Sequence, residues 1–180
     1  WYAPYPTGSR FRRAGQRDGC LYASERIETA IAEDAFYRLL FFRDAPDAVR
    51  PRNPLERTAF HLRVETVRAI DLTQPPLDRD AVTWSHPTDY SHSQDLADAA
   101  RSAGTRVIRY ASVRDTGRNA NLAILSYEAL ASREPEAQQT WHMMIRHDRL
   151  EAFREMPRLT LVFRFADWAA LDPRITPSLA

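Results

Sequence analysis

Residues 24–43 constrain the fold more than any other part of the sequence. Ile27, Ile31 and Ala35 recur at helical spacing, which predicts an amphipathic helix, and Ser24 is the expected N-cap. The second half of this stretch reads FYRLLFF and is apolar nearly all round. A helix of this kind needs cover on more than one side. We therefore expect the rest of the chain to close over it.

One carboxylate of this helix, Glu33, falls among apolar neighbours. With residues spaced by about 100° around a helix, it shares an arc with Ala30 and Phe36 and lies away from Glu28 and Ala32, the expected exposed side. Burying an unpaired carboxylate is costly. Glu33 therefore predicts either a structural ion pair with an arginine or a functional group in a cleft, and spacing alone leaves both open.

The other periodic segments predict an α+β fold with a mainly antiparallel sheet. A second helix is expected over 93–102, with Gly104 as its C-cap, and a short helical cap over 168–171 before a loose tail. Alternation or short apolar runs predict strands, with the last three completing the sheet. These strands are expected at 20–23, 58–66 continuing to 72, 107–110, 121–125, 139–147, 149–154 and 159–165.

Composition bounds the class of protein. The 180 residues are expected to form one domain, 1–180, and a net charge of +1 gives no global field that would attract nucleic acid or an anionic membrane. All 25 basic residues are arginine, which excludes a lysine Schiff base and a Walker phosphate loop. The single cysteine, Cys20, is expected in the core and fits a reducing cytoplasm. No apolar run approaches the ~18 residues of a membrane span, and we expect no signal peptide.

Several familiar site motifs are absent. The pairs His142 and His147, and His86 and His92, lack metal-ligand spacing and have no accompanying cysteine pair, so no metal is expected. No GxGxxG fingerprint follows a strand. No GxSxG elbow surrounds Ser112, which is read either as an ordinary serine at a strand end or as a ligand contact.

The stretch before the first helix carries a different kind of signal. Arg10, Arg12 and Arg13 form a cluster whose guanidinium groups suit phosphates. Tyr22 follows in a short strand, and Glu33 comes next along the chain. A cation, an aromatic ring and a carboxylate in one short stretch are what a site for a charged nucleotide needs.

Three motifs in order resemble the RES domain, the toxin part of bacterial toxin–antitoxin pairs whose partner is an Xre-type antitoxin. The family is named for an arginine, a glutamate and a serine. The resemblance spans residues 8–126. It rests on SRFR at 9–12, Tyr22 in CLYAS, Glu33 in TAIAED, Ser112 in RYASVR and the segment RNANL at 118–122.

The resemblance implies a fold and an activity. It implies an ADP-ribosyltransferase-like fold, with a mixed, mainly antiparallel sheet core, flanking helices and an NAD cleft. Members consume NAD by hydrolysis or phosphorolysis of the nicotinamide–ribose bond, or by ADP-ribosylation of a protein. It also implies an antitoxin partner and a hetero-oligomer with it.

The resemblance assigns catalytic roles to three residues. Glu33 is expected to stabilise the oxocarbenium-like ribose that forms as the N-glycosidic bond breaks. Arg10 is expected to clamp the pyrophosphate, and Tyr22 to stack on or hydrogen-bond the nicotinamide–ribose end.

Four more residues are expected to bind substrate. Ser112 is assigned to a ribose hydroxyl or a phosphate. Arg12 is the alternative to Arg10 as the family arginine, and Arg114 and Asn121 lie in the matching segments. Two further alternatives stay open: a mono-ADP-ribosyltransferase that modifies a cellular protein, and a non-catalytic nucleotide-binding or protein-interaction module.

Overall fold

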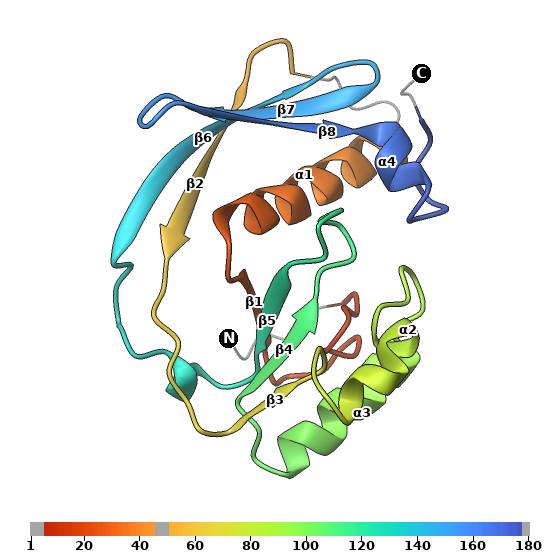
Figure 1. The fold of residues 1–180 in the computed structure, drawn as a ribbon, viewed down its shortest axis with the longest axis vertical. Helices are drawn as coiled ribbons and strands as arrows, with labels where there is room; N and C mark the ends of the chain where they lie inside the picture. The colour runs from red at the N-terminus through yellow and green to blue at the C-terminus, as the bar shows by residue number, and fades with distance from the viewer. Residues whose placement is uncertain (1–5, 46–50, 178–180) are drawn as a thin grey trace.

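The computed structural model describes residues 6–45 and 51–177, and it has the expected α+β fold (Figure 1). Within these described residues, eight strands form two four-stranded sheets, accompanied by four helices and two 3₁₀ turns. The strands are β1 (Leu21–Ser24), β2 (Leu55–His61), β3 (Ala69–Asp71), β4 (Val107–Ala111), β5 (Ala120–Ile124), β6 (Ala137–Ile145), β7 (Arg149–Arg154) and β8 (Leu159–Arg164). The helices are α1 (Ile27–Asp44), α2 (Ala81–Trp84), α3 (Ser91–Ser102) and α4 (Phe165–Ala169), and the 3₁₀ turns are η1 (Leu77–Asp80) and η2 (Tyr127–Ala129).

The strands do not form the single sheet expected from sequence. The first sheet has the order β1-β5-β4-β3, and only the β3–β4 pair in it is parallel. The second has the order β2-β6-β7-β8 and is fully antiparallel. The last three strands therefore join β2 and not the first sheet. The expected strand over 58–72 is also divided: β2 ends at His61, and β3 pairs in the other sheet.

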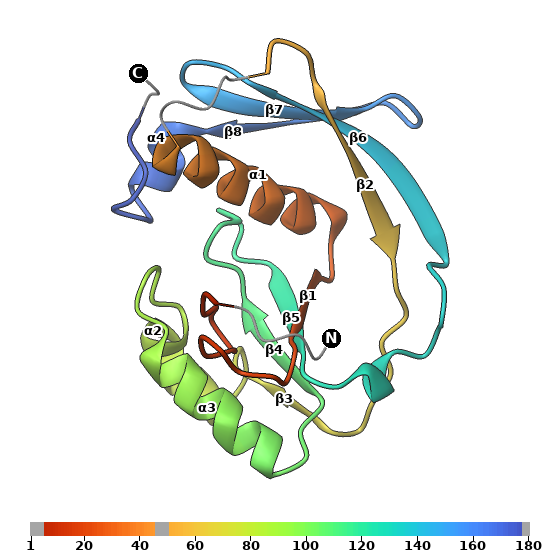
Figure 2. The ribbon, with the colours of Figure 1, turned by 180° about the vertical axis from the view of Figure 1, so that it is seen from behind.

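Helix α1 lies between the two sheets (Figures 1 and 2). It contacts β1 on one side and β7 and β8 on the other. Toward the second sheet, Phe36 and Leu39 join a core that includes Trp141, Leu150 and Trp168, all at most 1 % exposed. This placement explains how one short chain buries so apolar a helix.

Burial around α1 differs from the sequence expectation at Ala32. This residue was expected on the exposed side, yet it is only 2 % exposed, because the helix is covered on more than one side. In the FYRLLFF half, Phe36 and Leu39 are buried, whereas Tyr37 and Phe41 are 51 % and 52 % exposed. One side of α1 therefore remains available to line a cavity.

The second helix matches its prediction closely. Helix α3 ends at Ser102, and Gly104 follows with a φ of +75°, a conformation that favours glycine. The N–H of Gly104 donates to the Arg101 carbonyl (2.9 Å), and that of Thr105 donates to the Ala100 carbonyl (2.9 Å). These bonds are a Schellman-type ending. Among the described residues, no helix is long and apolar enough to cross a membrane.

The segment after β8 is not the loose tail that was expected. Trp168 of α4 is 1 % exposed, and Ile175 beyond it is 5 % exposed. Between them lies Asp172, a carboxylate that is only 1 % exposed. A buried charge in a tail needs a partner, and here the partners lie at the candidate site.

Candidate active site

A cavity of about 520 Å³ lies beside α1, on the side that faces the first sheet. Its walls come from the arm at residues 8–10, β1, α1, Tyr90, the β4–β5 region and Arg174. Of the seven residues predicted for the site, five line it: Arg10, Tyr22, Glu33, Arg114 and Asn121. A more open cavity of about 270 Å³ lies at the C-terminal end of α3, and none of the seven lines it.

Glu33 projects from α1 into the cavity and is held by two neutral donors. Its Oε1 accepts hydrogen bonds from Ser112 Oγ (2.7 Å) and from Asn121 Nδ2 (2.6 Å). Ala30 and Tyr37, on the same side of the helix, also line the cavity. Of the two interpretations of Glu33 that the sequence left open, the geometry matches the cleft and not an ion pair with arginine.

Asn121 is itself oriented by Ser24. The Ser24 hydroxyl donates to Asn121 Oδ1 (2.6 Å), which leaves the amide N–H groups to donate to Glu33. Ser24 was expected to cap α1, but it is the last residue of β1. The N-cap is Arg26, which makes no side-chain capping bond. The hydroxyl that sequence reasoning placed at a helix end therefore supports the site.

Ser112 is fully buried behind Glu33 and does not line the cavity. Besides donating to Glu33, its hydroxyl accepts the backbone N–H groups of Arg114 (3.1 Å) and Asp115 (3.0 Å). Its donor and both its acceptor positions are thus used within the protein. The structure brings Ser112 to the glutamate, and its predicted contact with substrate stays a prediction.

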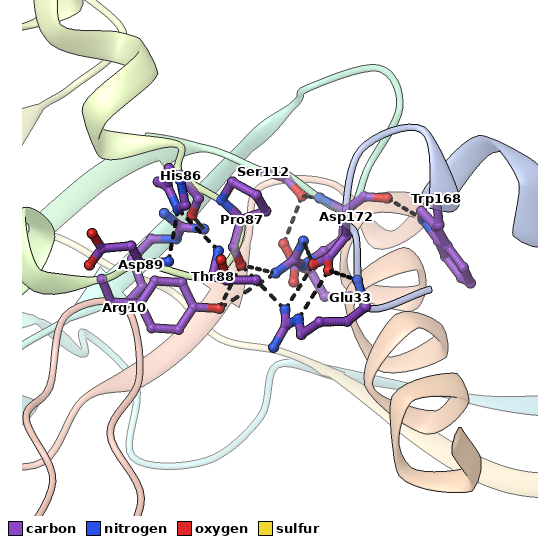
Figure 3. A network of polar contacts seen from close by, with 12 residues as sticks. Arg10, Glu33, His86, Pro87, Thr88, Asp89, Ser112, Trp168 and Asp172 are labelled. Carbon is purple, nitrogen blue, oxygen red and sulfur yellow. Dashed lines mark hydrogen bonds and ion pairs between the residues drawn. The ribbon is translucent and has the colours of Figure 1, made fainter. Parts of the chain in front are cut away.

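Arg10 is the arginine of the cluster that lines the cavity. It is 7 % exposed, and its guanidinium donates to the carbonyl of His86 (3.0 Å; Figure 3). The guanidinium also donates to the carbonyl of Trp84 (2.6 Å) and lies 4.9 Å from the centre of the Tyr90 ring. Within the described part of the chain, none of its bonded partners is a carboxylate. A buried guanidinium held by dipoles and a π-face alone favours an anionic ligand.

The other two arginines of the cluster lie elsewhere. Arg12 donates to the Gln16 carbonyl (2.8 Å) and is not among the cavity residues. Arg13 forms ion pairs with Asp95 and Asp98 of α3. Their positions favour Arg10 over Arg12 for the role of the family arginine.

Tyr22 connects the arm to the first sheet. Its hydroxyl accepts the Phe11 N–H (3.0 Å) and shares a hydrogen bond with Ser9 Oγ (2.8 Å). Burial raises the pKa of Tyr22 well above its ordinary value, so the phenol is neutral. Burial likewise raises the pKa of Tyr110, and the charge of Glu33 adds to that shift.

Arg114 forms a buried ion pair with a residue that sequence reasoning missed. Its Nη1 donates to Asp172 Oδ2 (2.7 Å), its Nη2 donates to the Pro87 carbonyl (2.8 Å), and its guanidinium lies 4.0 Å from the centre of the Phe36 ring. Trp168 donates from its indole N–H to the Arg114 carbonyl (2.7 Å). These contacts attach the segment after β8 to the site (Figure 3).

Arg174 and Tyr90 were also missed as cavity residues. Both Asp172 and Arg174 lie beyond the motif-bearing span, in a stretch with no recognisable pattern, and Tyr90 is one of several scattered aromatic residues. No local signal in the sequence marks them. Within residues 6–45 and 51–177, no group of three or more His, Cys, Asp or Glu side chains could hold a metal ion.

A comparison with protein families agrees with this geometry. The model of the RES domain matches residues 1–146, so the chain belongs to the RES domain family. Proteins with this domain are generally associated with NAD-degrading toxins. The match includes Arg10, Glu33 and Ser112, and it stops before Asp172 and Arg174. No curated protein sequence matches the chain.

Proposed function

We propose that the chain is an NAD-consuming toxin that cleaves the nicotinamide–ribose bond of NAD. One observation carries the proposal: a carboxylate held in place, Glu33, and a buried cation with no described carboxylate partner, Arg10, line the same cavity. The Glu33 carboxylate suits the positive charge that develops on the ribose, and the Arg10 guanidinium suits a phosphate.

Glu33 is arranged to act on the ribose. Both of its described hydrogen bonds use Oε1, which leaves Oε2 for a ligand. When the C1′–N bond breaks, its electron pair leaves with nicotinamide and positive charge develops on the ribose. A carboxylate already fixed beside that carbon stabilises the charge without reorganising. Water or phosphate then attacks C1′ and loses a proton to solvent.

Arg10 and the cavity tyrosines support the binding of the rest of the dinucleotide. The guanidinium of Arg10 donates to a phosphate oxygen, and the aromatic rings of Tyr22, Tyr37 and Tyr90 provide faces for the nicotinamide or adenine ring. Burial raises the pKa of Tyr22 and Tyr37, so these two phenols are neutral and do not repel the negatively charged diphosphate. Arg114 shapes the wall, since its charge is already bonded to Asp172.

The proposal includes a protein partner. A toxin of this kind requires a cognate inhibitor, and we expect an Xre-type antitoxin that forms a hetero-oligomer in the cytoplasm. Tyr37 and Phe41, each about half exposed on α1, support this, because exposed aromatic residues beside a site favour protein contacts. Tyr37 also lines the cavity, so a partner that covers it would block substrate.

The test is release of nicotinamide by the purified chain without antitoxin, with and without inorganic phosphate. Glu33→Gln keeps the size of the side chain but removes the charge, and we expect the rate to fall by about 100-fold or more. Glu28→Gln, on the same helix and outside the cavity, is the matched control. Stimulation by phosphate would identify a phosphorylase.

Two results would contradict the proposal. Equal rates for wild type and Glu33→Gln would remove Glu33 from the chemistry. Transfer of ADP-ribose to a protein with no free turnover of NAD would instead establish the ADP-ribosyltransferase alternative, visible as a mass increase on the acceptor.

A further inference from the structure

Arg174 presents a guanidinium to the cavity from outside the RES match. Its Nε and Nη2 donate to the two oxygens of Asp172 (3.0 and 2.8 Å), and its Nη2 also approaches the Pro87 carbonyl (3.3 Å). The side chain is still 28 % exposed, and it lines the cavity. It is therefore anchored on one side and open on the other.

The anchor is rigid. Asp172 is fully buried and also accepts the backbone N–H of Arg174 (2.9 Å), and the flanking Trp168 and Ile175 are buried. An arginine usually loses considerable rotamer freedom when it binds a ligand. Here the hydrogen bonds to Asp172 already fix the Arg174 side chain before a ligand binds, so Arg174 is preorganised for an anion.

The charges of this cluster are not balanced by the carboxylates bonded to it. Arg114 and Arg174 share one carboxylate, Asp172, and Arg10 has none among the described residues. Three guanidinium groups and one carboxylate leave two positive charges without a bonded counterion. A diphosphate diester carries one negative charge on each phosphate and offers one to each of these two positive charges, whereas Glu33 in the same cavity is bonded to neutral donors.

Arg10 and Arg174 are also held close together. Arg10 donates to the carbonyl of His86, and Arg174 donates to the carbonyl of the next residue, Pro87. Consecutive Cα atoms lie about 3.8 Å apart across a trans peptide, so one short stretch of loop positions both guanidinium groups. Both arginines also line the same cavity, so one ligand can contact both.

We propose that Arg174 is a phosphate-binding residue that, with Arg10, holds the two phosphates of the substrate. The identity of the substrate rests on the proposed function, whereas the diphosphate chemistry rests on the arginine cluster. On this view, the segment after β8 completes the binding site.

The test measures the affinity for ADP-ribose by calorimetry. Arg174→Gln loses the charged hydrogen bonds, and we expect Kd to rise about 10- to 100-fold, with a matching rise in KM for NAD and kcat within about threefold. Arg174→Lys, which keeps the charge but not the fork, is expected to restore part of the affinity. Arg146→Gln is the matched control, since it removes an exposed arginine that is paired with Glu151 (3.3 Å) and does not line the cavity.

A second measurement needs no variant and covers the case in which Arg174→Gln does not fold. If both phosphates are bound, ADP binds the wild-type protein at least about tenfold more tightly than AMP. Equal affinities for ADP and AMP, or an unchanged Kd for ADP-ribose in folded Arg174→Gln, would overturn the inference.

The outcomes separate this inference from the proposed function. Nicotinamide release with no effect of Arg174→Gln on Kd or KM would reject the phosphate role alone. Binding of ADP-ribose that depends on Arg174, without any nicotinamide release, would reject the N-glycosidic chemistry alone.

Discussion

Replacing Ser112 by alanine decides whether this residue binds substrate or positions Glu33. The Ser112 hydroxyl makes one hydrogen bond to a carboxylate and accepts two backbone N–H groups. A hydrogen bond to a charged group contributes about 1.5–3 kcal/mol, and a buried amide left unpaired costs about 1–3 kcal/mol. Relaxation and entry of water reduce the sum, so we expect a loss of about 3–5 kcal/mol of stability.

The effects on stability and catalysis should separate cleanly. In a chain of this size, about 2–4 °C of Tm is lost per kcal/mol, so Ser112→Ala should lower Tm by about 6–20 °C. If Ser112 positions Glu33 for the transition state, a loss of 1.5–3 kcal/mol of transition-state stabilisation lowers kcat by about 10- to 150-fold. KM should stay within about threefold of wild type, because the hydroxyl does not reach the cavity.

The assay is thermal unfolding together with nicotinamide release over a range of NAD concentrations. Ser126→Ala is the control, since Ser126 also accepts a backbone N–H but lies outside the cavity. A tenfold rise in KM with kcat unchanged would refute the positioning role and restore the direct substrate contact predicted from sequence. A Tm of Ser112→Ala unchanged from wild type would show that the hydrogen bonds of the Ser112 hydroxyl do not stabilise the fold by the amount expected.

Two further predictions concern titration. Burial acts to raise the pKa of Asp172, but its bonds to Arg174 and the nearby charges outweigh this and hold it below its ordinary value. The contribution of this carboxylate to stability is therefore complete above the unfolded pKa, near 4, and is lost as pH falls through the lower folded value. In urea unfolding between pH 5 and 2, the free energy of unfolding should fall steeply for the wild type and less steeply for Asp172→Asn. Identical pH slopes for the two proteins would contradict this prediction. Burial raises the pKa of the Cys20 thiol to about 11, so at pH 8 only about one thousandth of this thiol is thiolate. An aromatic disulfide reagent should therefore react slowly with Cys20 until urea unfolds the protein. Immediate reaction of the folded protein would contradict this prediction.

Sequence reasoning succeeded where the signal was local or was carried by motifs. The helical arc of Glu33 placed this carboxylate among apolar neighbours and left an ion pair and a cleft open, and the residues of the arginine and glutamate motifs, Arg10 and Glu33, line one cavity. Helix α1 and the end of α3 at Gly104 followed from periodicity and backbone chemistry. Such features depend on residues that are close in sequence, so the sequence displays them.

Long-range pairing had no such signal. Alternation over 58–66 predicts a strand, but it does not show whether the neighbour of that strand is β4 or β6, so one sheet was expected where there are two. Burial of Ala32 depends on elements far along the chain. Asp172 looks like any surface aspartate until the fold brings it to Arg114.

The ion pair between Arg114 and Asp172 also has a consequence for protein synthesis. The chain is made from the N-terminus, so Glu33, Ser112 and Arg114 are all translated before Asp172. Until that carboxylate arrives, the guanidinium of Arg114 has no counterion, and a buried cation without one disfavours closure of the site. A nascent chain, or a fragment cut between β8 and Asp172, should therefore lack a closed site, and the cavity beside α1 is completed only when the segment after β8 has folded against that helix.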